Sequence, residues 1–155
     1  GGQLESFARR SFDDVAVLGQ GALYPIASEV ALKVMESSSS YAQFFHTLEF
    51  RHGPKSIIDG RALVIGLIAD ASAEYETRVL REMKDLGAST MAVVNHATRE
   101  TRDAADLLVE LNSPLPGLAL LVAYVVWGQL LGSYVGMAKE LNPDEPRNLS
   151  RVVTF

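Results

Sequence analysis

Short, mostly apolar runs recur along the chain, and such runs are typical of strands buried on both faces of a parallel sheet. Five runs fit this pattern, at residues 15–18, 41–45, 62–69, 90–94 and 107–111. Helical periodicity covers residues 22–37 and 72–86, and a long apolar helix is expected at 116–141. This alternation predicts an α/β fold, a three-layer α/β/α sandwich around a five-stranded parallel sheet with right-handed crossovers.

The 155 residues are enough for one complete hydrophobic core, and no linker or internal repeat divides them. We expect one domain at residues 13–155, preceded by a linker or N-terminal helix at 1–12. The chain opens with Gly-Gly and no methionine, which we interpret as a cloning scar or a cut end. The domain is therefore expected to be one part of a longer protein.

Charge and composition exclude several classes of function. The net charge of −5 argues against a nucleic-acid surface, which needs clustered lysine and arginine. The absence of cysteine excludes a disulfide framework, a zinc-thiolate site and a thiol nucleophile. It also suits a reducing compartment, so we expect a cytoplasmic protein. His46, His52 and His96 lack the spacing of a zinc site, and no metal is expected.

Two patterns have an alternative interpretation. Residues 114–138 carry no charge, and glycines recur there every fourth residue, as in a membrane helix. We favour a helix inside a globular fold or at a subunit interface, because the strands need covering helices, and expect no membrane contact. Gly19-Gln20-Gly21 follows a strand as in a dinucleotide-binding turn. Tyr24 stands where the third glycine would be, so no organic cofactor is expected.

Two groups of ionisable residues could carry chemistry. Glu29, Lys33 and Glu36 share one helix face at spacings of four and three residues. They form either a solvated ion-paired face or the lining of a cleft that a neighbouring domain or subunit would close. His52 lies in a polar stretch at residues 48–55, and is either a neutral-pH acid/base or part of a surface loop.

Three segments carry a family resemblance. Residues 27–36, 49–54 and 146–150 resemble the second sugar isomerase (SIS) domain of tandem phosphosugar proteins, and the likeness extends over about residues 13–155. These proteins include the isomerase part of glucosamine-6-phosphate synthase, tagatose-phosphate-type ketose/aldose isomerases and amino-sugar phosphate deaminases. The segment Phe-Arg-His-Gly-Pro-Lys-Ser at residues 50–56 is most similar to the corresponding segment of the ketose/aldose isomerases.

The resemblance implies roles for four residues. Glu36 would move a proton between C1 and C2 of the sugar. His52 would help to open the sugar ring and would reach into the neighbouring subunit's site. Lys33 would lie in the same pocket as Glu36. Arg151 stands where the synthases have a lysine nucleophile; it stays protonated, so it could orient an anionic substrate but not form a Schiff base.

The expected function is aldose-ketose isomerisation of a sugar or amino-sugar phosphate by enediol proton transfer, with no cofactor. The alternatives are a non-catalytic sugar-phosphate-binding or dimerisation module, and an amino-sugar phosphate deaminase. Residues 69–74 have one hydroxyl, no glycine and two carboxylates, so we expect this domain not to bind the phosphate itself. An N-terminal SIS domain would bind it, and the protein is expected to be a homodimer.

Overall fold

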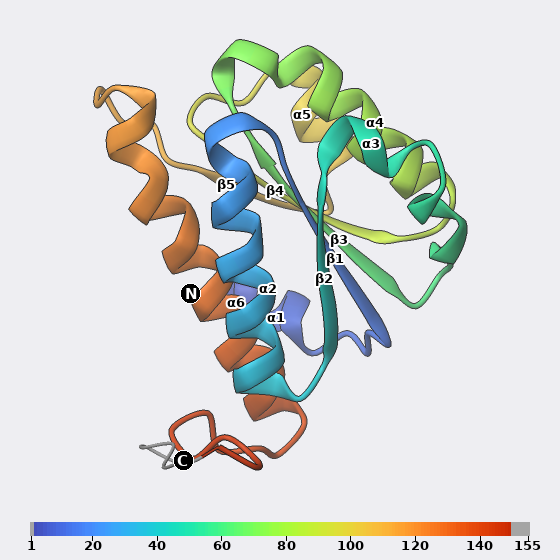
Figure 1. The fold of residues 1–155 in the computed structure, drawn as a ribbon, viewed down its shortest axis with the longest axis vertical. Helices are drawn as coiled ribbons and strands as arrows, with labels where there is room; N and C mark the ends of the chain where they lie inside the picture. Colours follow the sequence, from blue (N-terminus) through green and yellow to red (C-terminus); the bar gives the residue numbers. More distant parts are fainter. Residues whose placement is uncertain (1, 150–155) are drawn as a thin grey trace, which may run out of the picture.

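The computed structural model describes residues 2–149. Its centre is one sheet of five strands in the order β2-β1-β3-β4-β5, in which every neighbouring pair is parallel (Figure 1). The strands are β1 (Asp14–Gly19), β2 (Tyr41–His46), β3 (Ala62–Ile68), β4 (Ser89–Val94) and β5 (Leu107–Glu110). All seven residues of β3 are buried, which explains why its sequence shows no polar face.

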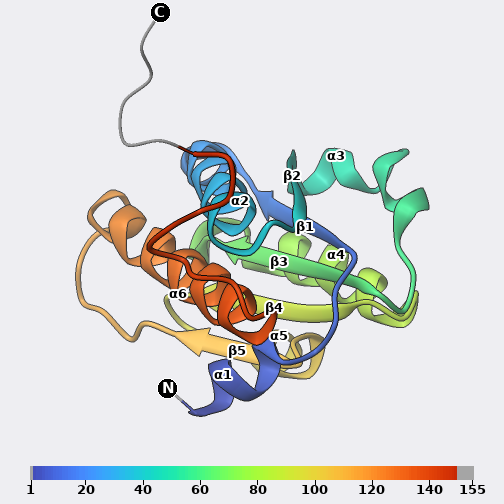
Figure 2. The ribbon, with the colours of Figure 1, turned by 90° about the horizontal axis from the view of Figure 1, so that it is seen from below.

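Helices cover both faces of the sheet. They are α1 (Gly2–Ala8), α2 (Tyr24–Ser38), α3 (Thr47–Phe50), α4 (Ala73–Asp85), α5 (Arg99–Ala104) and α6 (Leu121–Ala138). Helices α1, α2 and α6 pack on one face, and α3, α4 and α5 pack on the other (Figure 2). The three-layer α/β/α sandwich and its five parallel strands are confirmed.

Two details differ from the sequence-based expectation. Helix α5 was not predicted, because its six residues are mostly polar and too few to show a period; Thr98 caps it by accepting from the Thr101 amide. The long apolar helix opens with a 3-10 turn, η4 (Gly117–Leu120), and its α-helical part ends at Ala138. After β2, the short helix α3 ends at Phe50, and a 3-10 turn begins at Pro54.

Helix α6 packs closely against α2 through a row of glycines. A Cβ atom at Gly132 would lie 3.1 Å from the carbonyl oxygen of Lys33, and one at Gly136 would collide with the Ser37 carbonyl oxygen. The backbones of the two helices therefore touch, which only glycine permits at such a distance. The small-residue face was expected within the fold or between subunits, and it lies within the fold.

The outer side of α6 is apolar and exposed. Residues 117–138 have the length and the mean hydropathy (1.7) of a membrane-spanning helix, and about a third of that segment is buried. The inner side packs as predicted for a helix of a globular fold, with Leu131 and Val135 in the core. Leucine, valine and methionine side chains stay uncovered on the outer side, at Leu118, Val122, Val126, Leu130 and Met137.

Replacing Gly136 by alanine tests the α2–α6 contact. The added methyl group would force the two backbones apart, and we expect a loss of about 2 kcal/mol in the free energy of unfolding despite the better helix propensity of alanine. Urea unfolding measures this change. Gly117→Ala is the control, since a Cβ there meets open space, and equal stability of the two variants would contradict the packing.

Candidate functional site

Helix α2 carries the predicted polar cluster on one exposed face. The Lys33 Nζ lies 2.8 Å from Glu36 Oε2 and 3.7 Å from Glu29 Oε1, and the Lys33 and Glu36 side chains are each about a third exposed. The hydrogen bond to Glu36 raises the pKa of Lys33, and the charges of Glu36 and Glu29 add to this against the opposing effect of burial. Lys33 is therefore a fixed cation, suited to orient a neighbour rather than to accept a proton.

Exposed apolar side chains lie next to this pair along α2. Leu32 is 41% exposed and Met35 is 38% exposed, on the same helix as Glu36. Both line a shallow groove of about 470 Å³ between α2 and the edge strand β2, which Phe44 and Phe45 complete. About a third of the Lys33 and Glu36 side chains is open to solvent within residues 2–149, and an adjoining domain or subunit could reach the pair there.

His52 lies beyond the carboxyl end of β2, and Glu36 lies near the amino end of that strand. Strand β2 runs between Glu36 and His52, and its six residues span about 20 Å. His52 is exposed in the turn after α3, in a hollow shared with Lys55 and Ser56, and its neighbour Arg51 pairs with Glu82. One chain thus brings Lys33 and Glu36 together and leaves His52 far from them. Arg151 lies outside the described residues.

The end of α6 meets the end of α2, close to Glu36 in the sequence. Lys139 Nζ donates to the Ser38 carbonyl oxygen at 3.2 Å and to Ser40 Oγ at 2.7 Å, and burial lowers its pKa. Ser39 adopts a left-handed conformation there (φ 49°). The chain after α6 consequently leaves the fold at the Glu36 end of α2 (Figure 1). Sequence reasoning missed Lys139, whose only signal is that it ends the uncharged run.

The loop after β3 directs its donors inward. Glu76 is 1% exposed and accepts from the Ala69 amide (3.0 Å) and from Ser72 Oγ (2.7 Å). Burial raises the pKa of Glu76, although these hydrogen bonds oppose the shift. The Asp70 carboxylate accepts from the Asn95 side chain and pairs with His96 Nδ1 at 3.1 Å. The two carboxylates thus accept from four of the donors in and near this loop. That the loop does not bind a phosphate stays a prediction.

Two substitutions of Glu76 separate its charge from its hydrogen bonds. Glutamine keeps a partner for Ala69 and Ser72 without a buried charge, so at pH 7 we expect unchanged or slightly higher stability; alanine should cost about 2 kcal/mol, because it orphans the amide. Since the raised pKa lets the folded chain hold this proton longer than the unfolded chain does, wild-type stability should fall as pH rises above 4.5, the usual value.

Urea unfolding from pH 4 to pH 8 checks both variants, with the wild-type chain as reference. The pH-dependent fall assigned to Glu76 should be missing in Glu76→Gln. An equal loss of stability in the glutamine and alanine variants would contradict the role given to the two hydrogen bonds.

The fold and its open polar surfaces define a doubly wound α/β domain of the kind that binds small molecules at strand ends or between domains. The family model of the SIS domain matches residues 10–128. The chain belongs to the SIS domain family.

Curated relatives of the chain are isomerizing glutamine–fructose-6-phosphate aminotransferases. The chain is 34% identical to the enzyme of Sulfurisphaera tokodaii over 97% of its own length and 24% of that protein. It is 37% identical to the enzyme of Methanosarcina mazei over 88% of its length and 22% of that protein. The chain therefore spans about a quarter of the length of these relatives.

Solved structures share the fold. The C-terminal domain of glucosamine-fructose-6-phosphate aminotransferase from Francisella tularensis superposes with a TM-score of 0.82 at 24% identity, over 93% of this chain and 41% of that one. Tagatose-6-phosphate ketose/aldose isomerase from Escherichia coli superposes with a TM-score of 0.78 at 22% identity, over 96% and 45%. The chain is thus a SIS domain related to both groups of proteins, as its sequence motifs predicted.

Proposed function

We propose that residues 13–155 form the C-terminal SIS domain of a longer phosphosugar isomerase, which converts an aldose and a ketose form of a sugar or amino-sugar phosphate into each other. The observation that supports this most is the Lys33–Glu36 pair, a part-exposed carboxylate held by a fixed cation next to the exposed apolar side chains of Leu32 and Met35. The relatives named above include isomerizing enzymes, which favours the same chemistry.

The proposed reaction is a proton transfer between two neighbouring carbons. The Glu36 carboxylate removes the proton from the carbon next to the carbonyl group, and the electron pair moves to form an enediol. The same carboxyl group then returns the proton to the other carbon. Lys33 orients Glu36 and the sugar oxygens. This route requires proton transfer only, so it calls for no metal or organic cofactor.

Two groups outside the Lys33–Glu36 pair complete the proposal. His52 acts as the acid that opens the sugar ring, and it does so in the neighbouring subunit, since within one chain β2 separates it from Glu36. Arg151 keeps its charge and orients the anionic substrate. The phosphate binds to an N-terminal SIS domain, because Glu76 and Asp70 occupy the donors of the corresponding loop here.

The same surfaces indicate where the partners pack. Leu32 and Met35 beside Glu36, and the outer side of α6, are the apolar faces that the N-terminal SIS domain and the second subunit would cover. We propose a homodimer in the cytoplasm, where sugar phosphates are processed.

A non-catalytic sugar-phosphate-binding module is the second candidate. Two observations favour this second candidate: Glu36 is part-exposed, and the Ala69 amide already donates to Glu76. Both are compatible with a domain that binds a sugar phosphate without converting it. An amino-sugar phosphate deaminase would use the same base and would also release ammonia, so an assay for ammonium separates that activity from isomerisation.

Replacing Glu36 by glutamine in the full-length protein tests the base. We expect isomerisation of hexose and hexosamine 6-phosphates to fall by a factor of about 10³, with the midpoint of thermal unfolding nearly unchanged, since a part-exposed ion pair contributes little stability. Glu74→Gln on α4, a carboxylate paired with Arg78 away from this face, is the matched control. Turnover that survives in Glu36→Gln would refute the assignment and favour the binding module.

Mixed dimers test whether His52 works in the neighbouring subunit. Glu36→Gln and His52→Asn should each be inactive alone. After the two are unfolded and refolded together, random pairing puts one intact site in each mixed dimer and restores about a quarter of the wild-type activity. Activity of the mixed dimers that stays at the level of the single variants would show that both residues act within one subunit. A fully active His52→Asn variant would show that His52 has no role.

A further inference from the structure

The turn that carries His52 also carries a second basic residue. Lys55 follows His52 by three residues and lies in the 3-10 turn η2 (Pro54–Ile57). The Ile58 amide donates to the Lys55 carbonyl oxygen at 3.1 Å and closes this turn. Because the two basic side chains share one short, hydrogen-bonded turn, a surface that His52 approaches is approached by Lys55 as well.

The start of this turn is fastened to α4. Arg51 Nε donates to Glu82 Oε2 at 3.0 Å, and a second nitrogen of the guanidinium group pairs with the other carboxylate oxygen. The charge of Arg51 is therefore used within the chain, in a bidentate pair that also fixes the position of the turn. In the part of the chain that the structure describes, His52 and Lys55 form no such pair.

His52 and Lys55 line one shallow hollow of about 340 Å³. The rest of its lining consists of Arg51, Gly53, Ser56, Ile58 and Leu86. Within residues 2–149 no carboxylate lines the hollow, so its formal charges are positive and its ammonium, imidazole and hydroxyl groups can all donate a hydrogen bond. This composition fits a negative oxygen atom.

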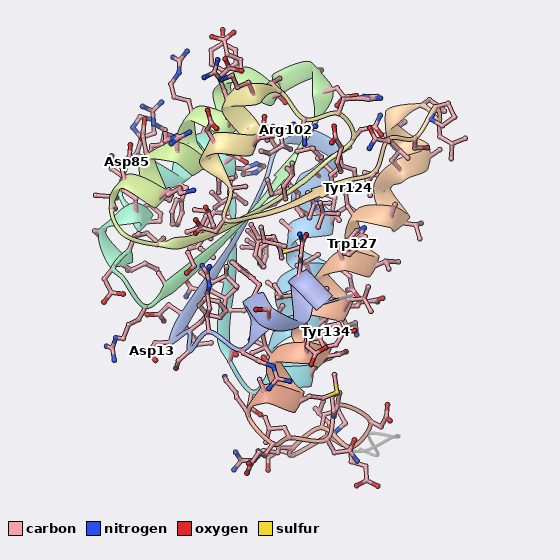
Figure 3. All side chains as sticks on the ribbon, turned by 180° about the vertical axis from the view of Figure 1, so that it is seen from behind. Asp13, Asp85, Arg102, Tyr124, Trp127 and Tyr134 are labelled. Carbon is pink, nitrogen blue, oxygen red and sulfur yellow. The ribbon has the colours of Figure 1, made fainter. Side chains whose placement is uncertain are left out.

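The hollow lies on the opposite side of the sheet from α2. Leu86 of its lining directly follows α4. In Figure 3 the end of α4 is marked by Asp85, and α6, which packs on α2, is marked by Trp127 on the other side of the sheet. Within one chain the sheet thus separates Lys55 from Glu36, and the two meet only where a neighbouring subunit supplies Lys55.

The Lys33–Glu36 pair lacks a cation that is free to stabilise new negative charge. Lys33 Nζ lies 2.8 Å from Glu36 Oε2 and 3.7 Å from Glu29 Oε1, so two carboxylates already share its charge. In the proposed reaction Glu36 takes a proton from carbon, the C–H electron pair forms the carbon–carbon double bond, and the π pair of the carbonyl group moves to its oxygen. That oxygen becomes negative, and a cation beside it lowers the barrier.

Few cations of the chain are free for that role. Among the described residues, the lysine and arginine side chains that form no ion pair are Lys55, Arg81, Lys139 and Arg147. Lys139 already donates to two oxygen atoms at and after the end of α2. Arg81 lines a different hollow, between α4 and α5, together with three carboxylates. Of the four, Lys55 is the one that shares its hollow with His52.

We propose that Lys55 is a further catalytic residue of the isomerase and acts in the site of the neighbouring subunit, where its ammonium group donates a hydrogen bond to the sugar oxygen that becomes negative when Glu36 removes the proton. His52 and Lys55 enter that site together, the first for ring opening and the second for the oxyanion. This inference rests on the proposed function and adds one residue to it.

Three substitutions in the full-length protein test the charge of Lys55. We expect Lys55→Gln to lower kcat by a factor of about 10² and to change KM less than about threefold, because the oxygen becomes negative only after the substrate is bound. Lys55→Arg keeps a cation and should retain at least about a tenth of the wild-type kcat. Arg81→Gln removes an unpaired cation elsewhere and should leave both parameters unchanged. The midpoints of thermal unfolding should stay close to the wild-type value in all three.

Mixed dimers locate the site in which Lys55 works. Lys55→Gln refolded with Glu36→Gln should restore about a quarter of the wild-type activity, because one site of each mixed dimer then has Glu36 and an intact turn from its neighbour. Lys55→Gln refolded with His52→Asn should stay at the level of the single variants, since every site receives a defective turn. A lysine that acted beside Glu36 of its own chain would give the opposite pattern.

The outcomes keep this inference and the proposed function apart. Equal kinetics of Lys55→Gln and Arg81→Gln, or the opposite pattern in the mixed dimers, would overturn the role of Lys55 while Glu36→Gln is still inactive. Turnover that survives in Glu36→Gln, or a wild-type protein that isomerises none of the hexose and hexosamine 6-phosphates, would overturn the proposed function and the inference with it.

Discussion

The contact between the backbones of α2 and α6 sets the position of the Lys33–Glu36 pair. Gly128, Gly132 and Gly136 let α6 lie directly on α2, and this fixes both ends of α2 at once. One end carries Lys33 and Glu36, and there Lys139 ties the close of α6 to the turn after α2. At the other end, the first turn of α6 forms a wall of a cavity of about 600 Å³ at the ends of β1, β3 and β4. A small shift between these helices would therefore alter both surfaces together, because packed interiors transmit displacement.

The two ends of the strands differ in the charged groups and hydrogen-bond donors that they present. A phosphate site at the strand ends needs free amide and hydroxyl donors. In this chain Glu76 is buried beneath the loop after β3 and takes two of those donors, while Asp70 adds negative charge above them. The positive charge of Lys33 lies at the far end of α2.

The sequence predicts the layers well and the contacts between them less well. Continuous apolar runs identify β1, β3 and β4 because burial on both faces leaves a signal in nearly every residue, whereas β2 and β5 at the margins of the sheet are only partly buried. The spacing of the glycines on α6 was visible, but not that their partner is α2, since periodicity reports a face and not its neighbour. In the sequence Glu76 looks like any other charged residue of a polar helix. Its burial could not be predicted, because it depends on the loop after β3, which folds over this one carboxylate.

The candidate catalytic residues show the limit of such prediction most clearly. Helical spacing correctly predicts that Lys33 and Glu36 lie together. His52 follows Glu36 by sixteen residues in the sequence, and this number does not reveal that the length of β2 separates the two side chains. The pair is about a third exposed, so it contributes little to stability. Its carboxylate would gain strength as a base only when water is removed around it, since charge interactions strengthen as the local dielectric constant falls. The apolar side chains beside it, Leu32 and Met35, are suited to that exclusion of water once a partner surface covers them. In this view stability resides in the glycine contact within the chain, and reactivity depends on an interface formed outside it.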